Sequence, residues 1–298
     1  MTGTHRYHGR DFTHDDIDLI RRLCADPAYP TRAAIARAVC DALGWHRIDG
    51  RRKDMAARVA LLRMADDGLI TLPPARHVTA NGRIPRYRAP DPQLTLELQP
   101  AGPAPTSLTD LGEITLDIVD TPQASKQWRT LIATYHYLGY TPLAGAQLRY
   151  LAHSPTHGPL AAFAFAASAY KCAPRDTYIG WDHPTREQRL HLIVGNARYL
   201  ILPHLHIPNL ASHLLARATR QLPTDWQQRY SYQPVLLETF VETGRYAGTT
   251  YKAANWTHVG TTTGRGKLDR HHRHALPVKD IYLHPLHRNW RRILTDPT

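Results

Sequence analysis

The sequence predicts a two-domain protein of mixed α/β (α+β) class, with a winged helix-turn-helix module over residues 1–76 and a larger mixed-sheet domain over residues 113–298. Three observations predict this organisation. A length of 298 residues exceeds the roughly 100–200 residues of one ordinary domain. Three closely spaced helix signals come first, and alternating strand and helix signals follow the start of the second domain. The segment 77–112 between them is rich in proline and basic residues, a composition typical of linkers.

The N-terminal module begins with two predicted helices. Thr13 is a candidate cap for the first, because a threonine hydroxyl accepts a hydrogen bond from the backbone three residues on, where Asp16 stands. Pro27 and Pro30 end this helix, since proline disrupts a helix interior. Thr31 then caps a second helix that is expected to reach the glycine after Leu43.

A third helix is predicted from Arg51 to Asp67, followed after Gly68 by a strand over residues 69–72. Three short helices and a strand are typical of a winged helix, whose third helix enters the major groove of DNA. The candidate nucleic-acid contacts are the basic residues at its leading end: Arg51, Arg52, Lys53 and Arg58. A three-helix protein-binding module with a solvated charged face stays the alternative.

Strand and helix signals alternate through the second domain. Strands are expected over residues 114–119, 147–152, 160–166, 192–202 and 235–241, and helices through Trp128 and Tyr135, from Pro208-Asn209 through Ala218, around Asp225-Trp226, and over 247–255. The run LIVGNARYLIL at 192–202 gives the strongest strand signal.

The bulk composition favours a polyanionic partner. A formal net charge of +12 suits DNA, because clustered Lys and Arg release counterions from phosphates on binding. No apolar run approaches the roughly 18 residues that cross a bilayer. Three cysteines, few and odd in number, fit a reducing compartment. We therefore expect a cytoplasmic DNA-binding protein with no membrane partner.

The segment from Gly248 to Lys267, GTTYKAANWTHVGTTTGRGK, is the strongest candidate site. It mixes small, aromatic and hydroxyl residues in a way that no core periodicity demands. A helix, a turn and a strand here would place Tyr251, Lys252 and Asn255 near the sheet edge. Tight packing of helix on sheet is the structural alternative for these three residues.

Two carboxylates of the second domain stand in settings where a carboxylate is either ion-paired or has a shifted pKa. Asp176 follows Arg175, and Glu238 lies inside an apolar strand. Both are candidate catalytic residues. A structural ion pair is the favoured interpretation, because buried ion pairs are often structural.

Long motifs in a fixed order resemble one known family. They are RDTYIGWD at 175–182, LIVGNARYLILPHLHIPNLASHLL, DWQQRY, PVLLETFVE and GTTYKAANWTHVGTTTGRG. Together they resemble the DruA family of Druantia anti-phage systems, which also occurs beside or within transposase genes. The N-terminal stretch GRDFTHDDIDLIRRL resembles the helix-turn-helix region of the same family. The resemblance implies a DNA-binding protein of a defence or mobile-element system, with other subunits of that system as partners.

A weaker, positional resemblance is to the GNAT acyltransferase fold, including the phage Mom-like DNA-modifying proteins. It implies acetyl-CoA as cofactor, with Asn209 and Ser212 at the cofactor-facing helix end and Tyr251, Lys252 and Asn255 in an acceptor pocket. It also places Arg265 and Lys267 against phosphate. GNAT enzymes hold the pyrophosphate on a glycine-rich loop before a helix. This chain has no glycine between residues 207 and 212.

Three functions therefore stay open for the second domain: chemical modification of nucleic acid, non-catalytic binding of DNA, and metal-dependent cleavage or strand transfer. The third is suggested by His204-Leu205-His206, which matches the paired histidines of rolling-circle nucleases. Chance pairs are expected among 19 histidines. The run Asp269 to His274 is interpreted as a basic solvated loop, and no metal ligand is assigned.

Overall fold

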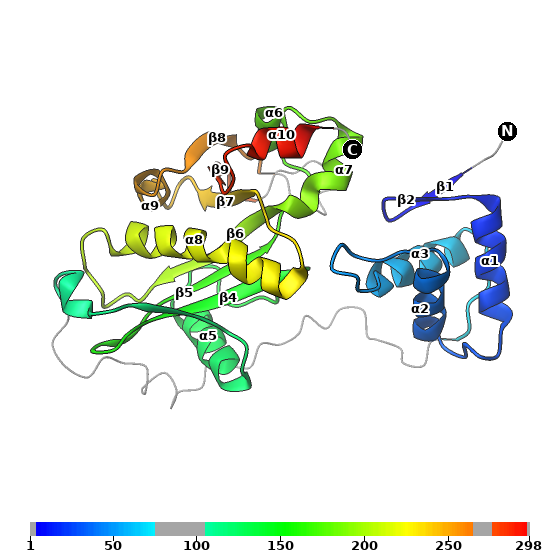
Figure 1. The fold of residues 1–298 in the computed structure, drawn as a ribbon, viewed down its shortest axis with the longest axis horizontal. Coiled ribbons are helices and arrows are strands. Elements are labelled where there is room, and N and C mark those ends of the chain that lie inside the picture. The colour runs from blue at the N-terminus through cyan, green and yellow to red at the C-terminus, as the bar shows by residue number, and fades with distance from the viewer. Residues whose placement is uncertain (1–3, 75–104, 265–275, 297–298) are drawn as a thin grey trace. The chain divides into compact units, whose positions relative to one another are not determined.

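The computed structural model describes residues 4–74, 105–264 and 276–296. The chain divides into two compact units, Met1–Arg86 and Tyr87–Thr298, which we call the N-terminal and C-terminal units (Figure 1). Each has a buried apolar core of its own. No described helix is long and apolar enough to span a bilayer.

The N-terminal unit contains a hairpin and three helices: β1 (His5–Tyr7), β2 (Arg10–Phe12), α1 (His14–Ala25), α2 (Arg32–Ala42) and α3 (Asp54–Asp66). The predicted caps are confirmed. The Thr13 hydroxyl accepts from the backbone N–H of Asp16, whose carboxylate accepts from the backbone N–H of Thr13, forming a capping box. Thr31 caps α2 through the backbone N–H of Ala34.

Two predictions for this unit are wrong in detail. Residues 69–72 form no strand, and Ile70 is buried against the helices instead. The strands of the unit are β1 and β2, joined by a tight turn at His8 and Gly9, whose positive φ angles of 51° and 77° suit a two-residue hairpin. The third helix begins at Asp54, so the basic residues 51–53 precede it.

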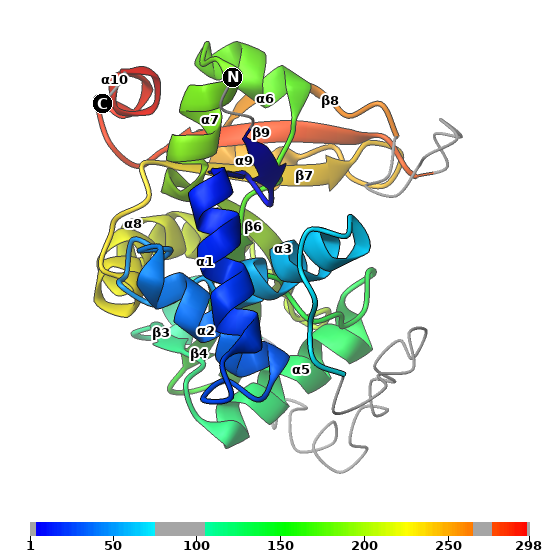
Figure 2. The same ribbon diagram turned by 90° about the vertical axis from the view of Figure 1, so that its right-hand side faces the viewer.

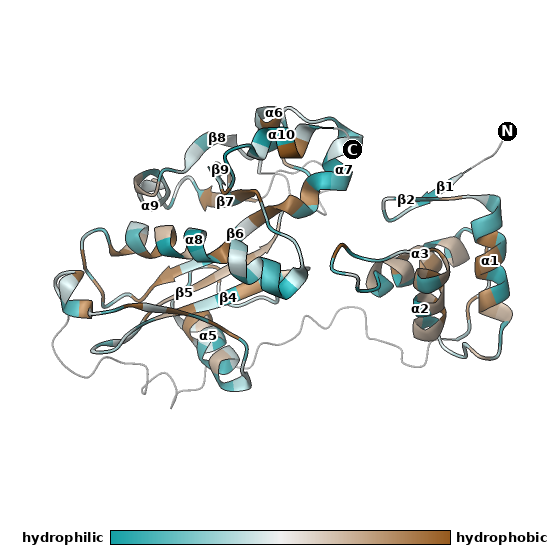
Figure 3. Ribbon diagram, in the orientation of Figure 1, coloured by the Kyte–Doolittle hydropathy of each residue, from teal (hydrophilic) through white to brown (hydrophobic). Residues whose placement is uncertain are grey.

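The C-terminal unit is built on a seven-stranded sheet with the order β3-β4-β5-β6-β7-β9-β8. The strands are β3 (Thr115–Ile118), β4 (Gln147–Ser154), β5 (Gly158–Ala167), β6 (Ile193–Ile201), β7 (Leu236–Glu242), β8 (Thr257–Thr261) and β9 (Lys279–Pro285). Neighbouring strands are antiparallel, with the exception of the parallel pair β6 and β7. Figure 3 shows apolar residues gathered along β5, β6 and β7, where the core lies.

Two long helices, α5 (Pro122–Tyr135) and α8 (Leu210–Tyr230), cover opposite faces of this sheet. Alternate residues of β4 reach each of them. The Arg149 guanidinium lies 5.4 Å from the ring centre of Trp128 in α5, whereas the Tyr150 hydroxyl donates to Asp225 in α8 at 2.9 Å. Successive side chains of a strand point to opposite faces.

The prediction of a separate short helix around Asp225-Trp226 is wrong, because α8 continues through Pro223. A proline inside a helix costs about 3 kcal/mol. Leu222 and Trp226 on either side of it are both fully buried. Burying one large apolar side chain contributes about 1.5–3 kcal/mol, so the burial of these two side chains offsets the cost of the proline.

Short helices complete the unit: η1 (Thr109–Leu111), α6 (Ala173–Ile179), α7 (His183–Arg189), η2 (Leu190–Leu192), α9 (Thr249–Ala253) and α10 (Trp290–Thr295). Figure 2 shows α6, α7 and α10 grouped beside strands β8 and β9. Their apolar residues form a smaller cluster with the first residues of β6 and β7.

The parallel pair β6 and β7 creates the main irregularity of the sheet. The two strands are paired only from Ile193 to Gly195 and from Leu236 to Glu238. Beyond that point β6 follows β5 and β7 follows β9, so the two strands diverge. The sheet therefore opens between them.

Candidate functional site

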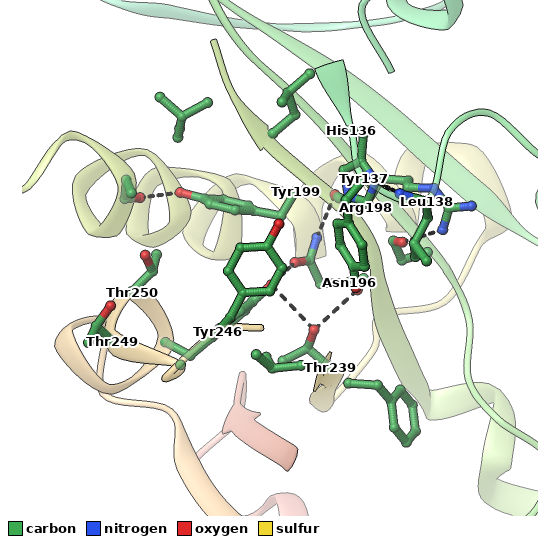
Figure 4. Close-up of a pocket in the computed structure, with 18 of the residues that line it drawn as sticks. His136, Tyr137, Leu138, Asn196, Arg198, Tyr199, Thr239, Tyr246, Thr249 and Thr250 are labelled. Carbon is green, nitrogen blue, oxygen red and sulfur yellow. Dashed lines mark hydrogen bonds between the residues drawn. The ribbon is translucent and has the colours of Figure 1, made fainter. Parts of the chain in front are cut away.

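A cavity of about 440 Å³ lies where β6 and β7 diverge, and we call it the wedge pocket (Figure 4). Its volume falls within the roughly 300–1,000 Å³ of small-molecule sites. Five parts of the chain line it: the end of α5 and the loop after it (135–138), the outer half of β6 (196–201) with Pro203 just beyond it, the first turn of α8 at Ala211, the middle of β7 (239–241), and the segment from Tyr246 to Tyr251.

Aromatic rings form the middle of the wedge pocket. Tyr199 stacks on Phe163 with ring centres 4.9 Å apart, and its hydroxyl donates to the carbonyl of Ala211. Tyr246 packs edge-on against Tyr137 at 5.2 Å. Its side chain is nevertheless 46% exposed. The pocket therefore has one fixed aromatic wall and one aromatic ring that a ligand can reach.

The buried floor of the wedge pocket is a hydrogen-bonded cluster of neutral groups. The Tyr251 hydroxyl donates to Asn196 Oδ1 at 2.7 Å and accepts from Thr239 Oγ1 at 3.3 Å. Burial raises the pKa of Tyr251 well above its ordinary value, so it stays a neutral phenol. The structure thus places Tyr251 in the buried floor of a pocket.

One end of the wedge pocket is cationic. The Arg198 guanidinium donates to the carbonyl of Ala197 and to Thr141 Oγ1, each at 2.7 Å. Its Nε is buried without a hydrogen-bond partner among the described residues. The described part of the chain also supplies no ion pair to Arg198, and no carboxylate lines the cavity. Arg198 is therefore an uncompensated positive charge facing a hollow.

His136 stands beside that charge and is neutral. Burial, followed by the positive charge of Arg198, lowers the pKa of His136 to about 4. The backbone N–H of Leu138 donates to His136 Nδ1 at 3.2 Å. A neutral imidazole that accepts at Nδ1 carries its proton on Nε2, so the second nitrogen is a donor.

The sequence prediction missed most of this pocket, including His136, Tyr137, Arg198 and Tyr246. One signal was present, since Arg198 is the charged residue within the apolar run 192–202. Of the other residues predicted beside Tyr251, the pocket lining includes neither Lys252 nor Asn255. Both are exposed, and Asn255 forms the turn after α9 with a φ of 61°.

The two predicted carboxylates are both engaged by Arg175, which is fully buried. Glu238 Oε2 accepts from Arg175 Nη1 at 2.7 Å, and its Oε1 accepts from the backbone N–H of Ala169 at 2.7 Å. Asp176 Oδ1 accepts from Arg175 Nε and Nη2 at 2.9 and 2.7 Å and from Trp181 Nε1 at 3.1 Å. This network ties α6 to the start of β7.

Asn209 and Ser212 lie at the start of α8, where the acyltransferase resemblance implies acetyl-CoA. Asn209 has a φ of 63° and caps nothing with its side chain, while the Ser212 hydroxyl donates back to the Asn209 carbonyl at 3.1 Å. Pro208 has no N–H to offer, and residues 202–212 contain no glycine. These residues do not fit a pyrophosphate cradle.

His204 and His206 lie in the loop between β6 and α8 rather than on a strand. The alternation that would point two imidazoles at one metal is therefore missing. No group of three or more His, Cys, Asp or Glu side chains suited to a metal gathers in residues 4–74, 105–264 and 276–296. Arg265, Lys267 and the run 269–274 lie outside the described residues.

The N-terminal unit carries a second polar hollow, between α2 and the loop before α3. We call it the arginine hollow, and it is lined by Arg37, Asp41, His46, Arg47, Gly50, Arg51, Arg52 and Asp54. Arg52 Nε contacts Asp41 Oδ1 at 2.6 Å. The Arg52 guanidinium lowers the pKa of that carboxyl.

The predicted nucleic-acid contacts therefore divide into two pairs. Arg52 and Arg58 are matched by carboxylates, Arg58 by Asp54 at 3.2 Å. Arg51 and Lys53 are exposed and have no ion-pair partner among the described residues. Arg37, which the sequence analysis did not predict, is also exposed and also has no ion-pair partner among the described residues.

Fold and site together define a two-unit protein with an arginine-lined hollow in the N-terminal unit and a mixed sheet that opens into a pocket in the C-terminal unit. The family described as Druantia protein DruA matches residues 67–276. The chain belongs to this family. The match begins at the end of α3, so the predicted likeness of residues 1–66 to the same family stays a prediction.

Solved structures of N-acetyltransferases are distantly similar. The Vibrio cholerae spermidine N-acetyltransferase solved with CoA and spermine has 11% identity and a TM-score of 0.37, over 57% of this chain and 92% of that one. A chimera of the V. cholerae spermidine N-acetyltransferase SpeG and hSSAT has 10% identity and a TM-score of 0.39, over 59% of this chain and 96% of that one. A putative phosphinothricin N-acetyltransferase has 12% identity and a TM-score of 0.38, over 59% of this chain and 100% of that one. No curated protein matches the chain.

Proposed function

We propose that this chain is a DNA-binding protein of an anti-phage defence or mobile-element system, and that its N-terminal unit holds the phosphate backbone at the arginine hollow. The observation that carries the proposal is the pair of uncompensated guanidinium groups of Arg37 and Arg51 at this hollow. Membership of the DruA family supports the defence context. It also supports other subunits of such a system as partners.

The electrostatics of the arginine hollow favour phosphate. Four arginines line it against two aspartates, so the hollow keeps a positive balance after its internal pairs are formed. An exposed guanidinium without a carboxylate partner is free to donate two parallel hydrogen bonds to a phosphate. Lys53, next to the positive end of the α3 dipole, adds to the same field.

The finer part of the proposal is that α3 faces the major groove, as in a helix-turn-helix protein. The pairing of Arg58 with Asp54 fixes the first turn of α3. Unpaired cations in the preceding loop would then lie over the backbone beside the groove. Phosphate contacts set the position of such a helix and carry no sequence information themselves.

The test measures the salt dependence of duplex binding by fluorescence anisotropy. For the full chain, the logarithm of the association constant is plotted against the logarithm of salt concentration between 50 and 300 mM. Each phosphate contact contributes about 0.9 to the slope. Arg37→Ala and Arg51→Ala are each expected to lower the slope by about 0.9, and the double variant by about 1.8.

The matched control is Arg22→Ala, which removes an equal charge from an exposed position of α1. Its slope is expected to equal that of the unmodified chain. If the double variant keeps the full slope, or if Arg22→Ala lowers it as much as Arg51→Ala does, the arginine hollow is not the phosphate site.

A further inference from the structure

The wedge pocket of the C-terminal unit has a chemistry that the proposed function does not use. Arg198 supplies one uncompensated positive charge, and the lining contains no carboxylate to balance it. Transferring an ionised side chain out of water is costly unless a partner compensates it. The buried, unpartnered Nε of Arg198 is a second unmet requirement at the same point. An anionic ligand with several acceptor oxygens would supply the missing negative charge.

A second donor reinforces this end of the pocket. Because His136 Nδ1 accepts from the backbone of Leu138, its Nε2 carries the proton. Figure 4 shows His136, Tyr137 and Arg198 together at one end of the cavity. A guanidinium and an imidazole N–H are both donors, so this end selects an acceptor-only group. Phosphate is such a group and forms charge-assisted hydrogen bonds with arginine.

The middle of the pocket selects a flat ring. Tyr199 is held rigidly by its stacking on Phe163 and by its hydroxyl bond to Ala211. Tyr246 also lines the cavity (Figure 4), with nearly half of its surface exposed. Proteins hold unstacked nucleobases against aromatic side chains of this kind.

The far end of the pocket offers hydroxyl groups to the edge of such a ring. Thr249 and Thr250, on the first turn of α9, lie there in Figure 4. Neither side chain forms a hydrogen bond with the rest of the described chain. A hydroxyl both donates and accepts, so this pair can meet either kind of polar atom on a base.

We propose that the wedge pocket binds one nucleotide unit, with its phosphate at Arg198 and His136, its base against Tyr246 and Tyr199, and the base edge at Thr249 and Thr250. The same chemistry is present in a free mononucleotide and in a nucleotide unstacked from a DNA strand. This site lies wholly within the C-terminal unit. It does not depend on the arginine hollow and goes beyond the proposed backbone binding.

The experiment titrates the full chain with deoxynucleoside 5′-monophosphates and with the matching nucleosides by calorimetry. The Arg37→Ala/Arg51→Ala background is used throughout, so that failure of the arginine hollow and failure of the wedge pocket are separate results. Monophosphates are expected to bind, and nucleosides to bind about 10- to 150-fold more weakly, the range for losing hydrogen bonds to a charged partner.

Two variants locate the binding, and each has a matched control. Arg198→Gln removes the charge and is expected to weaken monophosphate binding to the nucleoside level. Tyr246→Ala, at a position that is nearly half exposed, is expected to weaken it about 5- to 150-fold, the range for one base stacked on an aromatic ring. The controls are Arg220→Gln on the exposed side of α8 and Tyr178→Ala on α6, which should leave the affinity unchanged.

A 12-nucleotide single strand added as competitor distinguishes the two sources. If it displaces the monophosphate and its own binding weakens in Tyr246→Ala, the ligand is a nucleotide of a strand. If it does not compete while the monophosphate binds, the ligand is a free nucleotide. The proposal is overturned if neither probe responds to Tyr246→Ala, or if nucleosides bind as tightly as their monophosphates.

Discussion

His136 couples the wedge pocket to pH. Its pKa is about 4 in the folded chain because of burial and the nearby Arg198 charge, whereas an unperturbed histidine titrates near 6.5. Between these two values the unfolded chain binds a proton that the folded chain does not. The free energy of unfolding must therefore fall as pH drops from about 6.5 towards 4, and this contribution is fully present above pH 6.5.

We expect His136→Asn to remove that contribution while keeping an acceptor for the backbone N–H of Leu138. One pKa unit corresponds to about 1.36 kcal/mol, and the partial exposure of the side chain reduces the effect. Between pH 7 and pH 4.5 the variant should lose roughly 1 kcal/mol less stability than the unmodified chain. Urea unfolding at the two pH values measures this. Equal losses in both proteins would contradict the assigned environment of His136.

Arg175 and Arg198 of the C-terminal unit show how far the environment of a charged side chain can be predicted from the sequence. Arg175 is fully buried and compensated by Glu238 and Asp176, so its charge holds the fold together. Arg198 has no such partner among the described residues and faces a cavity. The sequence indicated that Glu238 and Asp176 were unusual, because carboxylates beside apolar residues or an arginine attract notice. It could not distinguish the two arginines, since Glu238, the buried partner of Arg175, is 63 residues away in the chain.

Helix α9 sets the far wall of the wedge pocket, and Gly248 fixes where it begins. Gly248 has a φ of 67°, and a Cβ added there would meet Tyr282 Cζ at 2.7 Å. The left-handed conformation alone costs a non-glycine residue about 1–2 kcal/mol. We expect Gly248→Ala to destabilise the chain by at least that amount and to shift the threonines of α9 away from the pocket.

The control for this element is Gly244→Ala, because Gly244 has no positive φ and open space around its Cα. It should be neutral or slightly stabilising. Denaturant unfolding compares the two variants, and NMR shifts of the Thr249 and Thr250 methyl groups report the displacement of α9. Equal stability of the two alanine variants would mean that α9 tolerates a different start.

At the level of elements, local signals predicted most of the scaffold but not the pocket. The Thr13 and Thr31 caps and the apolar runs of β5, β6 and β7 are encoded within a few residues, and they were predicted close to their observed bounds. The short helices α6, α7 and α10 lack a long apolar period. The divergence of β6 from β7 depends on which strands pair, and that information is spread across the whole unit.

At the scale of the whole molecule, the two units carry separate cores. The core of the N-terminal unit contains residues from Tyr7 to Ile70, and the two apolar clusters of the C-terminal unit contain residues from Leu111 onward. No buried apolar cluster of the described residues draws on both units. The family match begins at residue 67, within the N-terminal unit. The N-terminal core should therefore be stable without the other unit.

We expect a fragment of residues 1–86 to fold by itself and to unfold in one cooperative transition. Ile35 is fully buried in its core, and an Ile→Ala substitution in such a position costs about 2–5 kcal/mol because it leaves a cavity. Ile35→Ala should lower the free energy of unfolding by the same amount in the fragment and in the N-terminal transition of the full chain. Exposed Arg22→Ala should change neither. Circular dichroism during urea titration measures the free energy of unfolding of the fragment and of the full chain. If the decrease caused by Ile35→Ala differs between the two by more than about 0.5 kcal/mol, the N-terminal core depends on residues beyond 86.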